Sequence, residues 1–188
     1  MDLVVGKAGF DFVEDEVRAH LERAGVDPAS IALLNPSDEI ARFNLLNGVS
    51  LFLEHAIRLE GYADLAAGQS ALEDGNFRLR QLPVWESSAW APFELPTAGV
   101  LEEDPTFFVG SAPELLRDLD DIAARSKLAL ATPPAGYKRM RDDLAGFERS
   151  NEPLNLSKDE IIRWVWCALR DGAAIAVRER AVLCGTPD

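Results

Sequence analysis

The residues best suited to acid–base or metal chemistry are the two histidines, His20 and His55. Each falls on the inner side of a predicted helix, among apolar residues at helical spacing. A buried imidazole is costly unless its nitrogens are hydrogen-bonded, so each ring should have a partner. Two interpretations are open: the histidines meet in a general-base or metal site, or each is an independent inward-facing side chain. The second is favoured, because no cysteine, histidine or acid lies at ligand spacing from either.

Local motifs for nucleophilic, nucleotide or metal chemistry are missing from the sequence. There is no Gly-x-Ser-x-Gly elbow, and Lys7 follows Gly6 without the glycine spacing and the trailing Ser or Thr of a phosphate loop. Paired cysteines at zinc spacing and calcium-loop patterns are also missing, so we expect no cofactor and no metal. Acid–base sites assembled from distant segments leave no such pattern, and an enzyme of that kind stays open.

Basic residues occur in two segments that could share a ligand. Arg78 and Arg80 lie on one face of a predicted strand, and Arg139 lies in the first turns of a predicted helix, between Lys138 and Arg141. Together they could hold a small anion or a phosphate ester. They could equally neutralise nearby acids, which is the favoured interpretation. The alternative function is therefore a small-molecule enzyme or ligand-binding domain, with its anion site between sheet and helices and His20 or His55 as base.

The charge balance is the one unusual bulk property. The 32 acidic residues outnumber the 19 basic ones and give a net charge of −13. Such a charge repels nucleic acid phosphates and anionic membranes, and it attracts basic proteins. We therefore predict no nucleic acid partner and no membrane partner. The simplest interpretation of the charge is solubility alone.

Part of the negative charge is concentrated in one stretch. Glu102, Glu103 and Asp104 form an acidic loop, and the helix predicted after it continues the band with Glu114, Asp118, Asp120 and Asp121. If the loop folds toward that helix, these residues make one negative surface that could dock a basic protein. The alternative is a solvated loop beside the polar side of an amphipathic helix. Charge reversal in the loop is expected to slow association if the surface binds.

The segment 85–93 has the most distinctive local composition. Trp85, Trp90 and Phe93 interrupt small polar residues near prolines. Tryptophans on a surface anchor binding interfaces because they supply large contact areas at little entropic cost. Aromatic residues in a proline-rich segment also fold back to cover a core. Both interpretations are open, and the segment is the strongest candidate for a contact region.

The elements that position these residues predict an α+β fold. We expect a single domain over 1–188, with a helical part at 1–75, a strand-rich part at 76–110 and a helical part at 111–184. The strand-rich part forms a small antiparallel sheet from residues 77–110, including strands at 77–80 and 106–109, because alternation and prolines replace the helical pattern there. Helices flank it on both sides.

In the N-terminal part, a short strand is predicted at 3–5, and helices at 12–24, 37–59 and 62–72. In the C-terminal part, capping boxes at Ser111/Glu114 and Ser157/Glu160 open two helices. Arg117 and Asp121 are spaced for a surface pair. Between those helices, one helix carries a stripe of Tyr137, Met140, Leu144 and Phe147. The helix over 161–177 is the most hydrophobic segment and is predicted to be the core.

The cysteine pattern and the N-terminal residues indicate the cytoplasm. Cys167 lies within an apolar helical pattern, and Cys184 lies near a C-terminal tail that we expect to be frayed. The pattern gives no disulfide framework. No secretory leader precedes the first predicted strand, and no run approaches about 18 apolar residues.

Together these features favour a non-enzymatic interaction protein that binds and neutralises a basic protein partner, as an immunity protein, antitoxin or inhibitor does. Trp85, Trp90, Phe93 and the acidic band are the predicted contact residues. The hypothesis predicts a stoichiometric partner whose association slows as salt is added. No motif is specific enough to indicate a family, and none indicates an oligomeric state.

Overall fold

A sheet runs through the middle of the computed structural model, which describes residues 2–7, 13–64, 66–68, 79, 81–82, 87–95, 98–102, 104, 106–150 and 154–186. Its strands, in the spatial order β2-β1-β6-β3-β5-β4, are β1 (Asp2–Val5), β2 (Ala41–Asn44), β3 (Ser87–Ala91), β4 (Gly99–Val100), β5 (Phe107–Ser111) and β6 (Leu183–Thr186). The fold is α+β, as predicted.

The extent and type of the sheet differ from the prediction. Strands β1, β2 and β6 come from outside residues 77–110, so the sheet is not confined to the middle of the chain. It is mixed, because β3 and β5 run parallel whereas the other neighbouring strands are antiparallel. The strand predicted at 77–80 lies outside the described residues except for Leu79, which is buried.

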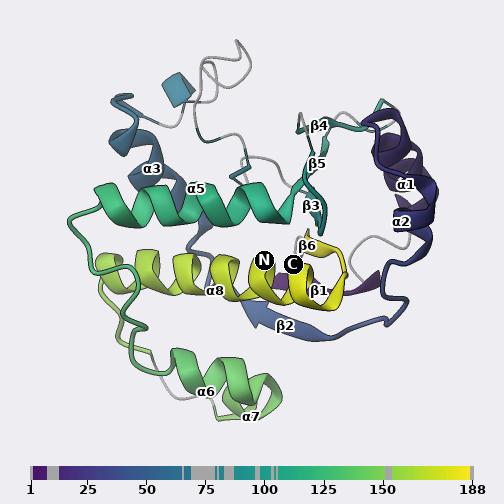
Figure 1. Cartoon of the computed structure of the whole chain (residues 1–188). Helices are drawn as coiled ribbons and strands as arrows, with labels where there is room; N and C mark the ends of the chain where they lie inside the picture. Colours follow the sequence, from purple (N-terminus) through teal and green to yellow (C-terminus); the bar gives the residue numbers. More distant parts are fainter. Residues whose placement is uncertain are drawn as a thin grey trace.

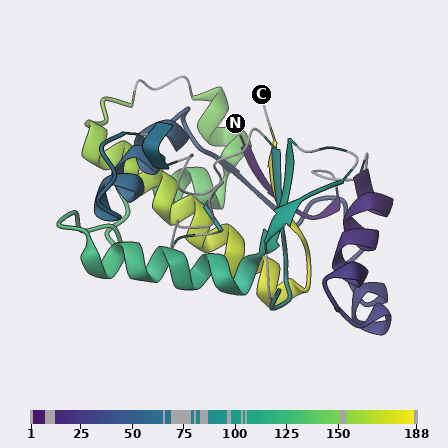
Figure 2. The ribbon, with the colours of Figure 1, turned by 90° about the horizontal axis from the view of Figure 1, so that it is seen from above.

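Helices cover both faces of the sheet (Figures 1 and 2). On one face lie α1 (Glu14–Arg23) and α2 (Pro28–Ala32). On the other lie α3 (Val49–Leu59), α5 (Ala112–Arg125) and α8 (Lys158–Glu179), with α6 (Tyr137–Asp142) and α7 (Leu144–Arg149) beside β2. None of the helices in the described residues has the length and apolar composition that crossing a membrane requires.

Alternation along the central strands divides the interior into two cores. In β3, Ala89 and Ala91 face α1, whereas Trp90 faces the larger helical layer. In β6, Leu183 faces the larger layer and Cys184 faces α1. Since both faces are covered, side chains on both sides of these strands are buried, including that of the polar Ser88 in β3.

The tail after Cys184 was expected to be frayed, but its residues 185 and 186 belong to β6, and Cys184 lies fully buried in that strand, between β1 and β3. In the sequence, the only strand signal here is a short apolar run before the C-terminus. Pairing with two neighbouring strands turns that run into the middle of the sheet, so this expectation was wrong.

Helix α8 is the core helix that its hydrophobicity predicted. Trp164 and Trp166 are buried, and their indole N–H groups donate to Asn44 O (2.8 Å) and Leu119 O (2.9 Å). These bonds tie α8 to the end of β2 and to α5. Cys167 is also buried, as its place in the apolar pattern predicted.

The capping box predicted for α8 is complete. Ser157 Oγ accepts a hydrogen bond from Glu160 N, and the Glu160 carboxylate accepts one from Ser157 N at 2.9 Å. Ser157→Ala is expected to lower the free energy of unfolding by about 1 kcal/mol, the usual value of a helix N-cap. Urea denaturation would measure it, and a change indistinguishable from zero would show that the exposed cap does not stabilise α8.

The box predicted at Ser111 is only half formed. Ser111 Oγ accepts from Glu114 N at 3.2 Å, but Ser111 N donates to Gln81 Oε1 at 2.8 Å instead of to Glu114. The Glu114 carboxylate binds Arg117. The predicted Arg117–Asp121 pair is likewise replaced, because Arg117 also binds Glu94 across the loop after β3.

Two helix predictions need correction. The helix expected over 37–59 begins only at Val49, because residues 41–44 pair with β1 as β2. Leu46 and Asn47 have positive φ angles and make the turn between the two elements.

The apolar stripe at 137–147 is divided between α6 and α7, and Asp143 caps α7 by accepting from Gly146 N. Of the helix expected at 62–72, residues 66–68 are helical and 65 and 69–72 lie outside the described residues.

Candidate functional site

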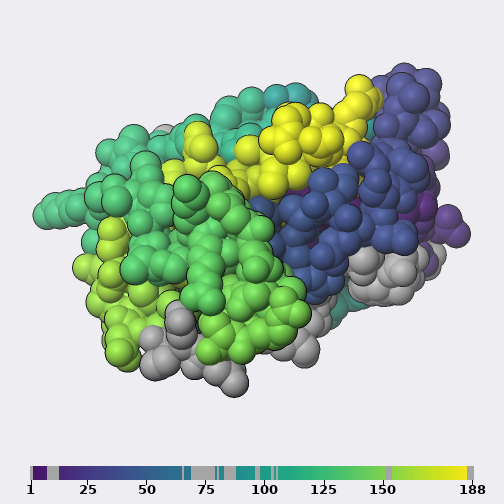
Figure 3. All heavy atoms as spheres, turned by 90° about the horizontal axis from the view of Figure 1, so that it is seen from below, coloured from purple at the N-terminus to yellow at the C-terminus, as the bar shows by residue number. Residues whose placement is uncertain are grey.

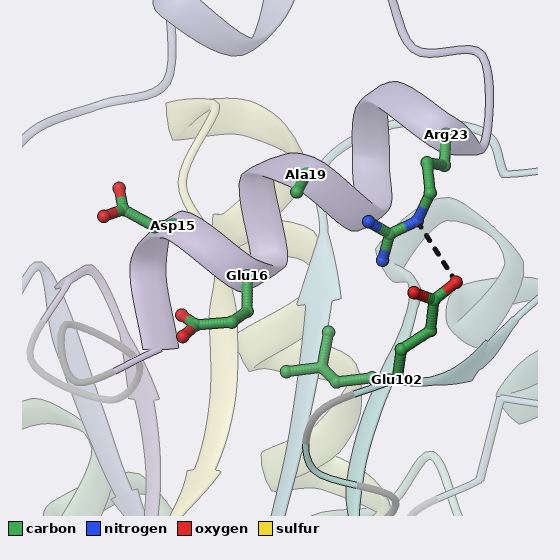
Figure 4. A pocket seen from close by; sticks show the side chains of 6 residues that line it. Asp15, Glu16, Ala19, Arg23 and Glu102 are labelled. Atoms are coloured by element: carbon green, nitrogen blue, oxygen red, sulfur yellow. Dashed lines mark ion pairs between the residues drawn. The ribbon is translucent and has the colours of Figure 1, made fainter.

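A groove lies between α1 and the segment that follows β4. Its volume is about 230 Å³, and its walls are Asp15, Glu16, Ala19 and Arg23 of α1 and Leu101 and Glu102 of the opposite segment (Figure 4). Asp15, Ala19 and Arg23 are spaced four residues apart and therefore share one side of the helix. The small side chain of Ala19 leaves space between the two walls.

Hydrophobic contacts hold α1 in this position. Val17 and Leu21 are buried and pack against the face of the sheet that contains Ala89 and Val109. The opposite wall is fixed as well, because Leu101 is buried and its N–H donates to Phe107 O at 3.0 Å. The groove is thus built on two anchored elements.

The charges in the groove are unbalanced. Three carboxylates, those of Asp15, Glu16 and Glu102, line the groove together with one guanidinium, that of Arg23. Arg23 Nε lies 3.8 Å from Glu102 Oε1, and both side chains are largely exposed. An ion pair that is this long and this exposed contributes little to the stability of the fold. Within the described part of the chain, the carboxylates of Asp15 and Glu16 make no ion pair or hydrogen bond, although their charges also favour the N-terminal end of α1.

The basic residues nearest to the start of α1 are engaged on another side of the helix. Lys7 and Arg18 both pair with Glu14, at 3.1 Å and 2.7 Å. These contacts lower the pKa of Glu14, with the hydrogen bond from Arg18 as the largest cause. Glu14 therefore pairs with two basic side chains that would otherwise offset the negative charges of Asp15 and Glu16.

The acidic residues predicted as one band occupy two regions. Glu102 is exposed at the groove, whereas the Asp104 carboxylate holds the turn before β5 by accepting from Thr106 N and Oγ1. Asp118 and Asp121 lie on α5, on the opposite face of the sheet. The structure therefore does not assemble them into a single surface, and Glu103 lies outside the described residues.

On α5, the two aspartates have structural contacts. Asp121 pairs with Arg125 at 2.6 Å. Asp118 is partly buried, and its Oδ2 accepts a hydrogen bond from Gln81 N at 3.0 Å. Burial raises the pKa of Asp118 to about 6, and the nearby acids Glu114, Asp121 and Glu60 add to the rise.

The structure describes two of the three aromatic residues in segment 85–93 and shows where each lies. Trp90 is fully buried, its indole N–H donates to Gln81 O at 2.8 Å, and it covers the core instead of the surface. Phe93 is partly buried beside the α1 face, with the Arg180 guanidinium 6.0 Å from its ring centre. Trp85 lies outside the described residues.

The two histidines do not meet. His20 belongs to α1 and His55 to α3, on opposite faces of the sheet. His55 Nε2 lies 2.9 Å from Ser126 Oγ, which supplies its predicted partner. Ser126 caps the C-terminal end of α5, so its contact with His55 joins α3 to that end of α5. Ser126 Oγ also accepts a hydrogen bond from Leu128 N. His20 has no hydrogen-bond partner among the described residues. Burial lowers the pKa of both rings, which favours their neutral forms.

The anion site predicted at Arg78, Arg80 and Arg139 has one member within the described residues. Arg139 is exposed on α6 and has an interaction of its own. Within the part of the chain that the structure describes, no group of three or more His, Cys, Asp or Glu side chains is arranged to hold a metal.

Comparison of the chain with protein-family models, curated proteins and solved structures gave no match. The sequence analysis did not predict the α1 side of the groove between α1 and the segment after β4. The only signal for it was Asp15 and Glu16 beside the small Ala19, and this pattern is common in the first turn of any helix.

Proposed function

We propose that this protein binds a basic protein partner and neutralises it, in the manner of an immunity protein, antitoxin or inhibitor, and that the groove between α1 and the segment after β4 receives a basic side chain of that partner. The observation that carries the proposal is the set of carboxylates of Asp15, Glu16 and Glu102, which line the groove with Arg23 as the only basic residue among its described lining.

The overall charge supports the same partner chemistry. A chain of net charge −13 attracts a basic protein at long range, and the groove offers a specific position where a basic side chain of that protein can bind. An arginine or lysine of the partner would form charge-assisted hydrogen bonds with Asp15 or Glu16 without displacing an existing ion pair between described residues. Stoichiometric occupation of a basic residue that the partner needs for its own activity would neutralise it.

The structure also narrows the set of residues that the proposal includes. Trp90 and Asp118 are removed from it, because Trp90 lies in the core and the partly buried Asp118 carboxylate accepts a hydrogen bond from Gln81 N. Asp104 supports Glu102 by holding the turn, so its substitution would test the fold of the loop together with binding. Glu16 and Glu102 are the better choices for substitution, since each faces the groove.

The double variant Glu16→Gln/Glu102→Gln is expected to slow association with the partner by on the order of tenfold at low salt, with a smaller effect as salt is added. The partner is first isolated with tagged protein from a lysate of the source cells at low and moderate salt. It is then produced separately, and its association rate is measured by surface plasmon resonance.

The matched control is Glu148→Gln/Asp159→Asn, which removes the same two charges at exposed positions in the helical layer on the other face of the sheet. If both double variants slow association equally, the partner responds to net charge alone and the groove is not its site. A partner whose binding is indifferent to salt and to both double variants would contradict the proposal as a whole.

A further inference from the structure

A second hollow lies within the larger helical layer, away from the groove. It has a volume of about 290 Å³ and lies between α8, α6 and the segment that joins α5 to α6. That segment and α6 appear in green on the face drawn in Figure 3. The side chains that matter for its chemistry are Tyr137 and Arg141 of α6 and Trp166, Arg170 and Asp171 of α8.

The inner wall of this hollow is formed by two largely buried aromatic residues. Tyr137 and Trp166 are 1% and 5% exposed, so each presents only a small area to the hollow. Their polar atoms are already engaged, because Trp166 Nε1 donates to Leu119 O and Tyr137 Oη donates to Asp171 Oδ2 at 3.0 Å. Cys167 adds no reactive group, since burial raises the pKa of its thiol to about 11.

Two arginines flank the hollow, and both are oriented in the same way. Arg170 Nε donates to Asp120 Oδ1 at 3.1 Å, and Arg141 Nε donates to Asp142 Oδ1 at 3.0 Å. The guanidinium of Arg170 also lies over the Trp166 ring, 5.6 Å from its centre. Each arginine is therefore held through its Nε, which leaves the two Nη atoms at its end.

The Nη atoms are available to a ligand. Within the described residues, Arg170 Nη1 and Nη2 donate no hydrogen bond. Arg141 Nη1 forms a long ion pair with Asp171 Oδ2 at 3.6 Å, too far for a hydrogen bond, so its N–H groups still have room for a ligand oxygen. The two-nitrogen end of a guanidinium matches the two oxygens of a carboxylate, and prior orientation lowers the entropy lost on binding.

The carboxylate of Asp171 places a second requirement on the chemistry of a ligand in this hollow. This carboxylate accepts from Tyr137 and lies beside Arg141 within the same hollow. A ligand that carries only negative charge would be repelled by it. A ligand that also carries a hydroxyl would donate a hydrogen bond to the remaining acceptor sites of this carboxylate.

We infer that this hollow binds a small hydroxycarboxylate: its carboxylate lies between Arg141 and Arg170, its hydroxyl donates to Asp171, and its carbon skeleton packs on Trp166. This is a small-molecule site on the other side of the sheet from the groove, and it does not depend on the proposed protein partner. It also differs from the anion site that the sequence predicted at Arg78, Arg80 and Arg139.

The test uses two compounds that differ in one hydroxyl, malate and succinate, titrated into the full chain by isothermal titration calorimetry at constant ionic strength. Malate is expected to bind at least about tenfold more tightly than succinate, the difference of one charge-assisted hydrogen bond. Arg170→Gln is expected to weaken malate about tenfold. The matched control is Arg178→Gln, an exposed arginine of the same helix that does not line the hollow, and it leaves malate binding unchanged.

Asp171→Asn separates the hydroxyl contact from the charge. The variant removes the repulsion, so succinate is expected to bind more tightly than it binds the natural chain, and the difference between the two compounds narrows. Circular dichroism confirms that each variant is folded, and Arg170→Lys, which keeps the charge, replaces Arg170→Gln if that variant unfolds. The inference is overturned if malate does not bind at concentrations up to about 10 mM. It is also overturned if malate and succinate bind alike, or if Arg170→Gln behaves as Arg178→Gln does.

Discussion

Gly110→Ala is expected to lower the free energy of unfolding by about 3–5 kcal/mol, the sum of an overpacked core and a broken buried hydrogen bond. A Cβ at this position of β5 would lie 2.3 Å from Gln81 Oε1, 2.7 Å from Phe108 Cε1 and 2.9 Å from Trp90 Cδ1. Contacts this short force the neighbours to move.

Gln81 cannot move without loss, because three hydrogen bonds hold it. Its Oε1 accepts from Ser111 N at 2.8 Å, its main-chain O accepts from Trp90 Nε1 at 2.8 Å, and its N donates to Asp118 Oδ2 at 3.0 Å. It is also one of the few buried polar residues in the described part of the chain, at 5% exposed. Displacing its side chain leaves the buried Ser111 N–H without an acceptor.

Urea denaturation of Gly110→Ala measures the loss, and thermal melting should show a fall of about 2–4 °C for each kcal/mol in a chain of this size. Gly99→Ala is the matched control. Gly99 lies opposite Val109 on the neighbouring strand, and among the described residues a Cβ there would meet only His20 Cε1, at an ordinary 3.5 Å. If Gly110→Ala costs as little as Gly99→Ala, the packing around Gln81 is looser than described.

Asp118→Asn is expected to stabilise the protein at about pH 8 and to have little effect at about pH 4, because burial raises the pKa of this carboxyl from 3.8 to about 6. At 1.36 kcal/mol for each tenfold change in proton affinity, the rise corresponds to an upper limit of about 3 kcal/mol. The amide oxygen of asparagine can still accept the hydrogen bond from Gln81 N.

The direction of this stability change depends on which protonation state of Asp118 the folded protein prefers. A carboxyl whose folded pKa is raised binds its proton more tightly when folded, so its neutral form is the stable one. Its contribution is fully present below pH 3.8 and is lost as the pH rises through about 6. Glu114, Asp121 and Glu60 face the same carboxylate and oppose its ionisation, although Arg125 is paired with Asp121 and Glu60.

The measurement is the difference in unfolding free energy between Asp118→Asn and the natural chain at several pH values. Taking the difference cancels the titration of the other carboxyl groups. Glu148→Gln, at an exposed position of α7, is the control for the loss of one negative charge. A difference for Asp118→Asn that varies with pH no more than the difference for this control would show that Asp118 is well solvated.

Several features of the fold could be predicted from the sequence because their causes are local. The cap of α8 depends on Ser157 and Glu160, which are three residues apart. Its burial depends on apolar residues around almost its whole circumference. The β2 segment was missed because Ile40 and Phe43 fit a helical stripe as well as a strand, and only pairing with β1 decides between them.

The candidate groove could be predicted only on one side. Glu102 was found because it lies in a run of acids, but its neighbours in space, Asp15 and Glu16, are far from it in the chain. Trp90 was ambiguous for a related reason. An aromatic residue among small ones fits a surface anchor or a core cover, and the alternation of β3 between the two cores places it inside.

By itself, the sequence determined the α+β class, the central helix, the caps and the acidic balance, since each depends on residue types or on spacing within one element. The tertiary structure alone decided which strands are neighbours and therefore which charged residues share a surface. Six strands in the order β2-β1-β6-β3-β5-β4 place β6, from the end of the chain, at the centre of the sheet. That sheet separates Glu102 from Asp118, because burying apolar side chains on both faces requires helices on both sides.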